Sequence, residues 1–140
     1  MTYQIGESSP PRVLIVDDEP AICAVLSTVL RRAGFDPVTA SGAPEAEALL
    51  DDSIDAMVLD LRSPYMRGDV FFHVATARFP RLRGRTLMMS GDNTPAAERL
   101  VSNTGCPCLW KPFANTELVN ALRSLFAESG GATTSSSSAS

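Results

Sequence analysis

Apolar runs that end abruptly at a charged or hydroxyl-bearing side chain are the feature of this sequence that most restricts its fold. The central run, residues 56–59, ends at Asp60. Three other runs end in the same way, at Asp17-Asp18, at Ser90 and at Lys111. Short continuous apolar runs are typical of strands buried on both faces. In an open α/β sheet, ligands bind at the edge formed by the carboxyl ends of such strands. We therefore expect these polar residues to meet in one pocket.

Segments with helical periodicity separate the apolar runs. After Pro20, apolar residues recur at the spacing of one helix face through Ala33, and Gly34 is a natural end for that helix. Strands are predicted at 12–16, 35–40, 54–59, 86–89 and 106–110, with helices beginning near 20, 41, 69, 94 and 113. Alternation of this kind predicts an α/β fold with a doubly wound, five-stranded parallel sheet and five helices. At this size the expected strand order is 2-1-3-4-5.

The bulk properties indicate a single domain of 140 residues with a formal net charge of −4. We expect a flexible leader at 1–11, a folded domain at 12–127 and a flexible Ser/Gly-rich tail at 128–140, which is a natural end or a linker to an output domain. An acidic chain without a basic stripe is not expected to bind nucleic acid directly. No apolar run reaches the roughly 18 residues that span a membrane. Three cysteines without a secretion signal predict reduced thiols in the cytoplasm.

The expected pocket has the composition of a phosphoryl-transfer site. Asp17, Asp18 and Asp60 would repel one another, and a divalent cation such as Mg²⁺ would relieve that repulsion. Lys111 would hold a phosphoryl group by charge, and the hydroxyl of Ser90 would donate a hydrogen bond to it. We therefore predict Asp60 as the nucleophile and the Asp17–Asp18 pair as metal ligands. Taken alone, the acidic run at 17–19 would also be explained as an N-terminal helix cap.

Four motifs together resemble the signatures of two-component response regulator receiver domains, the CheY-like family of flavodoxin-like fold. The motifs are Val16-Asp17-Asp18-Glu19-Pro20, Leu59-Asp60 followed by Pro64 and Gly68, Met89-Ser90-Gly91, and Trp110-Lys111-Pro112-Phe113. Each motif alone is weak, but the four in order at strand ends are specific. The resemblance covers residues 12–127.

The resemblance implies a role for each residue of the pocket. Asp60 would accept a phosphoryl group from the phosphohistidine of a histidine kinase or phosphotransfer domain. Asp18, Asp60 and the backbone carbonyl of Arg62 would bind Mg²⁺ directly, and Asp17 would assist through water. Ser90 and Lys111 would contact the phosphoryl group, and the Lys111-Pro112 peptide would be cis.

The resemblance also implies how such a chain acts. It would not be a classical enzyme, although it would catalyse its own phosphorylation and dephosphorylation. The kinase would dock on the helix after Asp18, near Ala21 and Ala24. The phosphorylated state would be passed to an unknown downstream protein by protein–protein contact, without a membrane partner. A homodimer that forms on phosphorylation is compatible with this picture.

Several positions depart from the family pattern. Ser63 stands where a methionine is common, and Cys108 replaces the usual aromatic switch residue. Trp110 is unusually large for its position, and we expect it either to join an output surface between the last two helices or to pack on the last helix. The opposite charges of Arg62 and Asp92 would either pair over the site and slow hydrolysis of the phosphate or remain two solvated loop charges.

Three other functions fit the sequence less well. A receiver-like interaction module that is never phosphorylated is disfavoured by the intact set of Asp60, Ser90 and Lys111. A magnesium-dependent aspartyl phosphatase would commonly need a second acid near the nucleophile, but Arg62 stands two residues after Asp60. A flavodoxin-type electron carrier would need a phosphate-binding loop after the first strand, and the acidic residues 17–19 would repel that phosphate.

Overall fold

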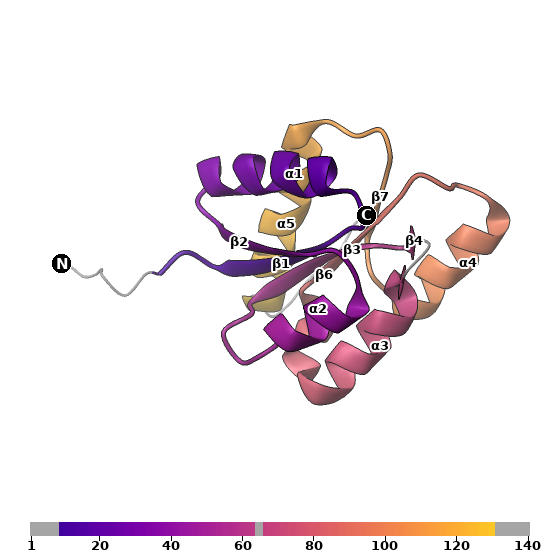
Figure 1. The fold of residues 1–140 in the computed structure, drawn as a ribbon, viewed down its shortest axis with the longest axis horizontal. Helices are drawn as coiled ribbons and strands as arrows, with labels where there is room; N and C mark the ends of the chain where they lie inside the picture. The colour runs from indigo at the N-terminus through magenta and orange to yellow at the C-terminus, as the bar shows by residue number, and fades with distance from the viewer. Residues whose placement is uncertain (1–8, 64–65, 131–140) are drawn as a thin grey trace.

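The computed structural model describes residues 9–63 and 66–130, and its central element is a five-stranded parallel sheet (Figure 1). The strand order is β2-β1-β3-β6-β7, which is 2-1-3-4-5 when the five strands are counted along the chain. The predicted doubly wound fold is therefore confirmed. The strands are β1 (Arg12–Val16), β2 (Asp36–Ala40), β3 (Ala56–Asp60), β6 (Thr86–Ser90) and β7 (Cys108–Trp110).

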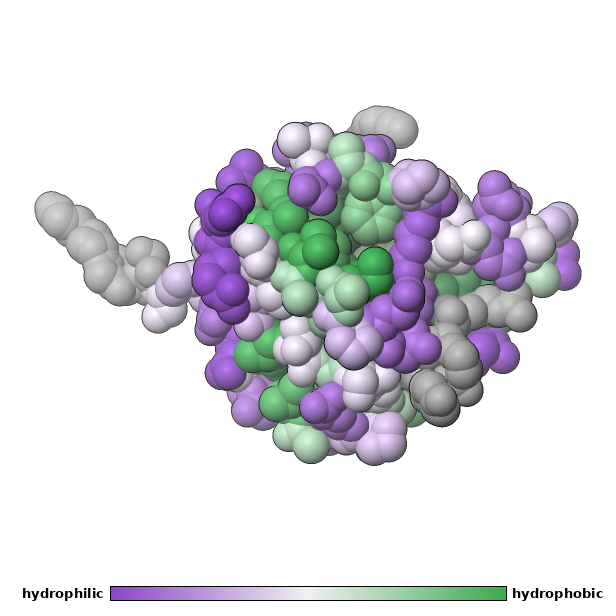
Figure 2. All heavy atoms as spheres, turned by 45° about the horizontal axis from the view of Figure 1, so that its top comes forward, coloured by the Kyte–Doolittle hydropathy of each residue, from purple (hydrophilic) through white to green (hydrophobic). Residues whose placement is uncertain are grey.

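Five α-helices cover the two faces of the sheet (Figure 1). They are α1 (Pro20–Arg32), α2 (Ala43–Leu49), α3 (Gly68–Arg78), α4 (Pro95–Thr104) and α5 (Asn115–Gly130). Helices α1 and α5 pack on one face, and α2, α3 and α4 pack on the other. Figure 2, which brings the α1 side forward, shows an apolar area bordered by hydrophilic side chains. No helix among the described residues is long and apolar enough to cross a membrane.

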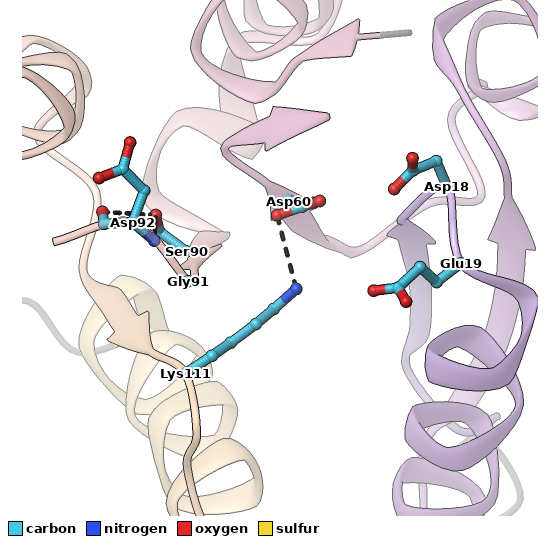
Figure 3. A pocket seen from close by; sticks show the side chains of 7 residues that line it. All are labelled: Asp18, Glu19, Asp60, Ser90, Gly91, Asp92 and Lys111. Atoms are coloured by element: carbon cyan, nitrogen blue, oxygen red, sulfur yellow. Dashed lines mark hydrogen bonds and ion pairs between the residues drawn. The ribbon is translucent and has the colours of Figure 1, made fainter. Parts of the chain in front are cut away.

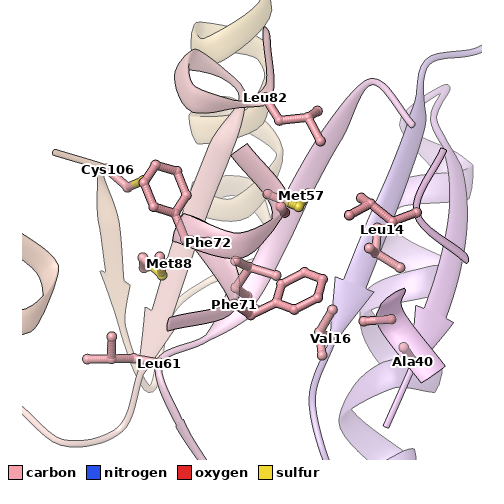
Figure 4. Packing of buried hydrophobic residues seen from close by; sticks show 14 of the residues in the cluster. Leu14, Val16, Ala40, Met57, Leu61, Phe71, Phe72, Leu82, Met88 and Cys106 are labelled. Carbon is pink, nitrogen blue, oxygen red and sulfur yellow. The ribbon is translucent and has the colours of Figure 1, made fainter. Parts of the chain in front are cut away.

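The core consists of two apolar clusters, one on each face of the sheet, because successive strand residues point to opposite faces. In β1, Leu14 and Val16 belong to the cluster under α2, α3 and α4, whereas Val13 and Ile15 belong to the cluster under α1 and α5. Figure 4 shows Leu14, Val16 and Phe72 within the first cluster. All five residues of β3 are buried. This explains why the strand sequences are continuously apolar rather than alternating.

Several boundaries differ from the predicted ones. Helix α5 continues to Gly130, beyond the predicted end of the folded domain at residue 127. A short 3-10 helix, Pro80–Gly84, follows α3, because Pro80 suits its first turn and Leu82 is fully buried. The loop after Asp60 contains a small antiparallel ribbon that was not predicted, formed by β4 (Arg62–Ser63) and β5 (Met66–Arg67). Two-residue strands are too short to show an alternating pattern. Most of the predicted leader and tail lies outside the described residues.

Gly68 closes the loop that follows the predicted nucleophile. Its backbone N–H donates a hydrogen bond to the carbonyl oxygen of Leu61, with a donor–acceptor distance of 2.7 Å. A Cβ atom at position 68 would overlap the backbone carbonyl oxygen of Asp60. The first residue of α3 therefore lies directly against the last residue of β3, and only glycine permits this approach.

We predict that Gly68→Ala lowers the free energy of unfolding by about 1–3 kcal/mol, because the added methyl group must displace backbone atoms. Urea unfolding followed by circular dichroism would measure the change. Gly91→Ala is the matched control, since a Cβ there meets only the Lys111 side chain, at 3.8 Å. Equal stability of Gly68→Ala and the parent protein would contradict the close approach.

Candidate functional site

The predicted acidic residues meet at the carboxyl ends of β1 and β3. One carboxylate oxygen from each of Asp17, Asp18 and Asp60 lies within 4.8 Å of the other two. This convergence follows from the parallel register, in which Val16 of β1 pairs with Leu59 of β3. Asp17 comes directly after Val16, and Asp60 comes directly after Leu59. Asp17 and Asp60 are buried, with 1% and 6% of their surface exposed, whereas Asp18 is half-buried.

Backbone hydrogen bonds hold the loop that carries Asp17. Its N–H donates to the carbonyl oxygen of Ala40 at 3.1 Å, and its carboxylate accepts from the N–H of Glu19 at 2.9 Å. The Sγ atom of Cys23 lies 3.4 Å from the carbonyl oxygen of Asp17 and donates to it. These contacts fix the direction of the Asp17 side chain before any ligand binds.

Lys111 is the cation of the cluster. Its Nζ atom lies 3.4 Å from Oδ2 of Asp17. The same atom lies 3.7 Å from Oδ1 of Asp60, the ion pair drawn as a dashed line in Figure 3. Burial would lower the pKa of Lys111, but the charges of Asp60 and Asp17 outweigh burial and raise it. The backbone N–H of Lys111 donates to the carbonyl oxygen of Ser90 at 2.7 Å. The Lys111-Pro112 peptide is cis, as the sequence comparison with the family predicted.

The pKa of the Asp60 carboxyl group is raised above its ordinary value. Burial raises its pKa from 3.8 to about 6, the positive charge of Lys111 opposes this rise, and the negative charges of Asp17 and Asp18 add to it. The ionised carboxylate therefore costs folding free energy. A bound cation would reduce that cost.

The Ser90 side chain lies in the pocket but is engaged with its own loop. Its Oγ atom is 2.9 Å from the carbonyl oxygen of Asp92, to which it donates, and 3.0 Å from the Asp92 backbone nitrogen, from which it accepts. Only 2% of Ser90 is exposed. A hydrogen bond from this hydroxyl to a group on Asp60 would require its side chain to leave Asp92.

Glu19 is a member of the pocket that was not predicted as a site residue. It lines the same pocket as Asp18, Asp60 and Lys111, and Figure 3 shows its side chain opposite the end of Lys111. Glu19 occupies the N-cap position of α1, yet its side chain makes no capping hydrogen bond. The Glu19 side chain therefore does not cap α1 through a hydrogen bond. Its position directly after Asp17-Asp18 in the sequence could have identified Glu19 as a residue of the pocket.

Some predicted features are not tested by these contacts. The backbone of Arg62 lies in β4, but its side chain and residues 64–65 lie outside the described residues, so its roles as a metal ligand and as a partner of Asp92 stay predictions. Trp110 is 36% exposed at the end of β7. Cys108 is half-buried against the core cluster under α2, α3 and α4.

The donor set suits Mg²⁺. Hard divalent cations prefer carboxylate and carbonyl oxygens. Three carboxylates converge here, and two of them, Asp18 and Asp60, line an open pocket. Lys111 pairs with Asp17 and Asp60, and its single positive charge cannot balance the three carboxylates of the cluster. The remaining negative charge is the physical reason to expect a metal at this place.

Comparisons with known proteins agree on one family. A model described as the response regulator receiver domain matches residues 13–123. The probable transcriptional regulatory protein TcrX of Mycobacterium tuberculosis is 30% identical over 134 residues, which are 94% of this chain and 56% of TcrX. The transcriptional regulatory protein CpxR of Escherichia coli is 30% identical over 84% of this chain and 50% of its own length. The chain thus spans about half the length of these curated relatives.

A solved structure gives the same result. The chemotaxis protein CheY4 of Vibrio cholerae superposes with a TM-score of 0.73 and 26% identity, covering 84% of this chain and 99% of that one.

We predict that Asp60→Asn raises the free energy of unfolding by roughly 1–3 kcal/mol above pH 7 without divalent cations. The raised pKa, about 6, means that the folded protein takes up a proton on Asp60 before the unfolded chain does. The parent protein therefore regains stability as the pH falls from 6 towards 4, and the difference shrinks. Urea unfolding in EDTA at several pH values would measure it.

The control is Asp36→Asn, which removes a carboxylate that is 54% exposed and should change stability by less than about 0.5 kcal/mol. A parent protein more stable than Asp60→Asn at pH 7.5 without metal would contradict the raised pKa.

Proposed function

This chain belongs to the response regulator receiver domains of two-component systems, and we propose that it accepts a phosphoryl group from a phosphohistidine onto Asp60. One observation carries the proposal. At the end of β3, the Asp60 carboxylate lies beside Asp17 and Asp18, with the Lys111 Nζ atom 3.7 Å from its Oδ1. A receiver domain is a signalling domain, so the result of the reaction would be a phosphorylated form of the domain itself.

The proposed reaction is phosphoryl transfer between two side chains. An oxygen of the ionised Asp60 forms a bond to phosphorus while the phosphorus–nitrogen bond to the donor imidazole breaks, and the imidazole keeps the electron pair. Because this oxygen is the nucleophile, Asp60 must be deprotonated. Asp17, Asp18 and Asp60 would hold Mg²⁺, which supplies charge neutralisation for the incoming phosphoryl oxygens.

Lys111 and Ser90 support the proposal as groups that would hold the product. The Lys111 Nζ atom is close enough to Asp60 to pair with a phosphoryl oxygen attached there. The Ser90 hydroxyl would exchange its hydrogen bond to Asp92 for one to the phosphoryl group, which changes the loop after β6. That change is the proposed output of the reaction.

The partners follow from this chemistry. The donor would be a histidine kinase or a phosphotransfer domain, docking near the exposed Ala21 and Ala24 of α1, beside the mouth of the pocket. A downstream protein would recognise the changed surface near Trp110, which is partly exposed beside the Ser90 strand. The cytoplasmic location expected from the sequence stays a prediction.

We predict Mg²⁺-dependent phosphorylation of the purified chain by acetyl phosphate, detected by intact mass spectrometry. Asp60→Asn should remove the label because it removes the nucleophile, whereas Asp36→Asn should keep it. Labelling should fall at acidic pH, since a protonated Asp60 cannot attack phosphorus, and bound Mg²⁺ should move this fall below the pKa of about 6 that Asp60 has without metal.

Labelling of Asp60→Asn at the parent level would contradict the assignment of the acceptor. A folded parent protein that binds Mg²⁺ but accepts no phosphoryl group from acetyl phosphate or from a panel of histidine kinases would support the alternative, an interaction module that works without phosphorylation.

A further inference from the structure

Helix α3 has no extended polar face. Its inner side carries Phe71, Phe72 and Ala75, which are buried in the core. Its outer side carries Val70, His73, Val74 and Ala77, all exposed. A surface helix normally presents polar residues to water, and a helix that is apolar all round is normally covered on both sides. The outer side of α3 is therefore a largely apolar surface that no described part of the chain covers.

The exposed valines border an apolar groove between α2 and α3. The groove is lined by Ala43, Glu47, Arg67, Val70, Phe71 and Val74. Val70 and Val74 are 52% and 41% exposed, and they are two of the four large apolar side chains exposed in the described part of the chain. Figure 1 shows the position of α2 and α3, the two helices whose residues line most of this groove. Clustered apolar exposure of this kind marks an interaction site more often than isolated exposed residues do.

The two edges of the groove carry opposite charges. Helix α2 contains Glu45 and Glu47 and no basic residue. Helix α3 is flanked by exposed arginines, Arg67 immediately before its first residue and Arg78 at its last. Asp69, the acidic residue of α3, is buried and paired with Arg67 at 2.8 Å, so these two charges balance and Arg78 supplies the net positive charge of the α3 edge. The side chain of Glu47 makes no hydrogen bond or ion pair within the described part of the chain, so its charge is available to a partner.

We propose that this groove is a self-association surface occupied by a second copy of the same chain. A two-fold axis that lies in the interface and runs along the groove sets α2 of one copy opposite α3 of the other. The acidic edge then meets the basic edge twice, and the exposed valines of both copies lie in the seam between them. The surface thus carries an acidic edge and the basic edge that would attract it. A second copy of the chain is therefore the partner that these charges favour.

This self-association does not depend on the chemistry at Asp60. The groove residues come from α2, α3 and Arg67, and they do not include the residues that line the acidic pocket. The dimer is therefore expected in the unphosphorylated protein. It differs in this from a dimer that forms on phosphorylation.

We expect sedimentation equilibrium of the unphosphorylated chain, up to about 0.5 mM, to show a reversible monomer–dimer equilibrium. Val74→Glu should raise the dissociation constant at least about tenfold, because it places two unpaired carboxylates in an apolar seam. Glu47→Lys should also weaken the dimer, and added salt should weaken the parent dimer, because the edges attract by charge.

The matched control is Val25→Glu, which makes the same change at a valine that is 53% exposed on α1, across the sheet. It should leave the dissociation constant within about twofold of the parent value, and Asp60→Asn should do the same. A parent protein that is monomeric at every concentration would overturn the proposal and leave the groove to a different protein. Equal weakening by Val25→Glu and Val74→Glu would overturn it as well, because a general loss of solubility would then explain both.

Discussion

Mutual repulsion among three carboxylates is the constraint on which the rest of this structure depends. Asp17, Asp18 and Asp60 have oxygens within 4.8 Å of one another, and two of these residues are almost fully buried. Such a cluster persists only where the surrounding structure holds it in place. The strands that carry it are buried on both faces, and Lys111 supplies a positive charge from the other side. The packing of the apolar core therefore offsets the repulsion among the carboxylates of the site.

The convergence of the site was predictable because it depends on strand register. Once the runs before Asp17, Asp60, Ser90 and Lys111 are parallel neighbours, their ends must lie at one edge of the sheet. The resemblance added the cis peptide before Pro112, which the structure contains. The roles of these residues in phosphoryl transfer are not decided by their positions, and they remain predictions.

Other features could not be read from the sequence because they depend on contacts between distant backbone segments. The β4–β5 ribbon forms from two residues on each side, too few for a periodic pattern. The Ser90 hydroxyl makes hydrogen bonds to the Asp92 backbone, and these depend on the conformation of the loop after β6. Gly68 was recognised as part of a motif, but its contact with the Asp60 carbonyl is visible only when β3 and α3 are placed together.

That contact links the acidic site to the outer side of α3. The helix begins at Gly68, whose N–H bonds to the carbonyl oxygen of Leu61, and its first turn packs on the backbone of Asp60. Phe71 and Phe72 then anchor the same helix in the core next to β3. Helix α3 thus joins the backbone beside Asp60 to the outer surface that carries Val70 and Val74. Coupling between the two would require a second arrangement of α3 with a different free energy. Self-association that leaves α3 in place is therefore independent of the acidic site.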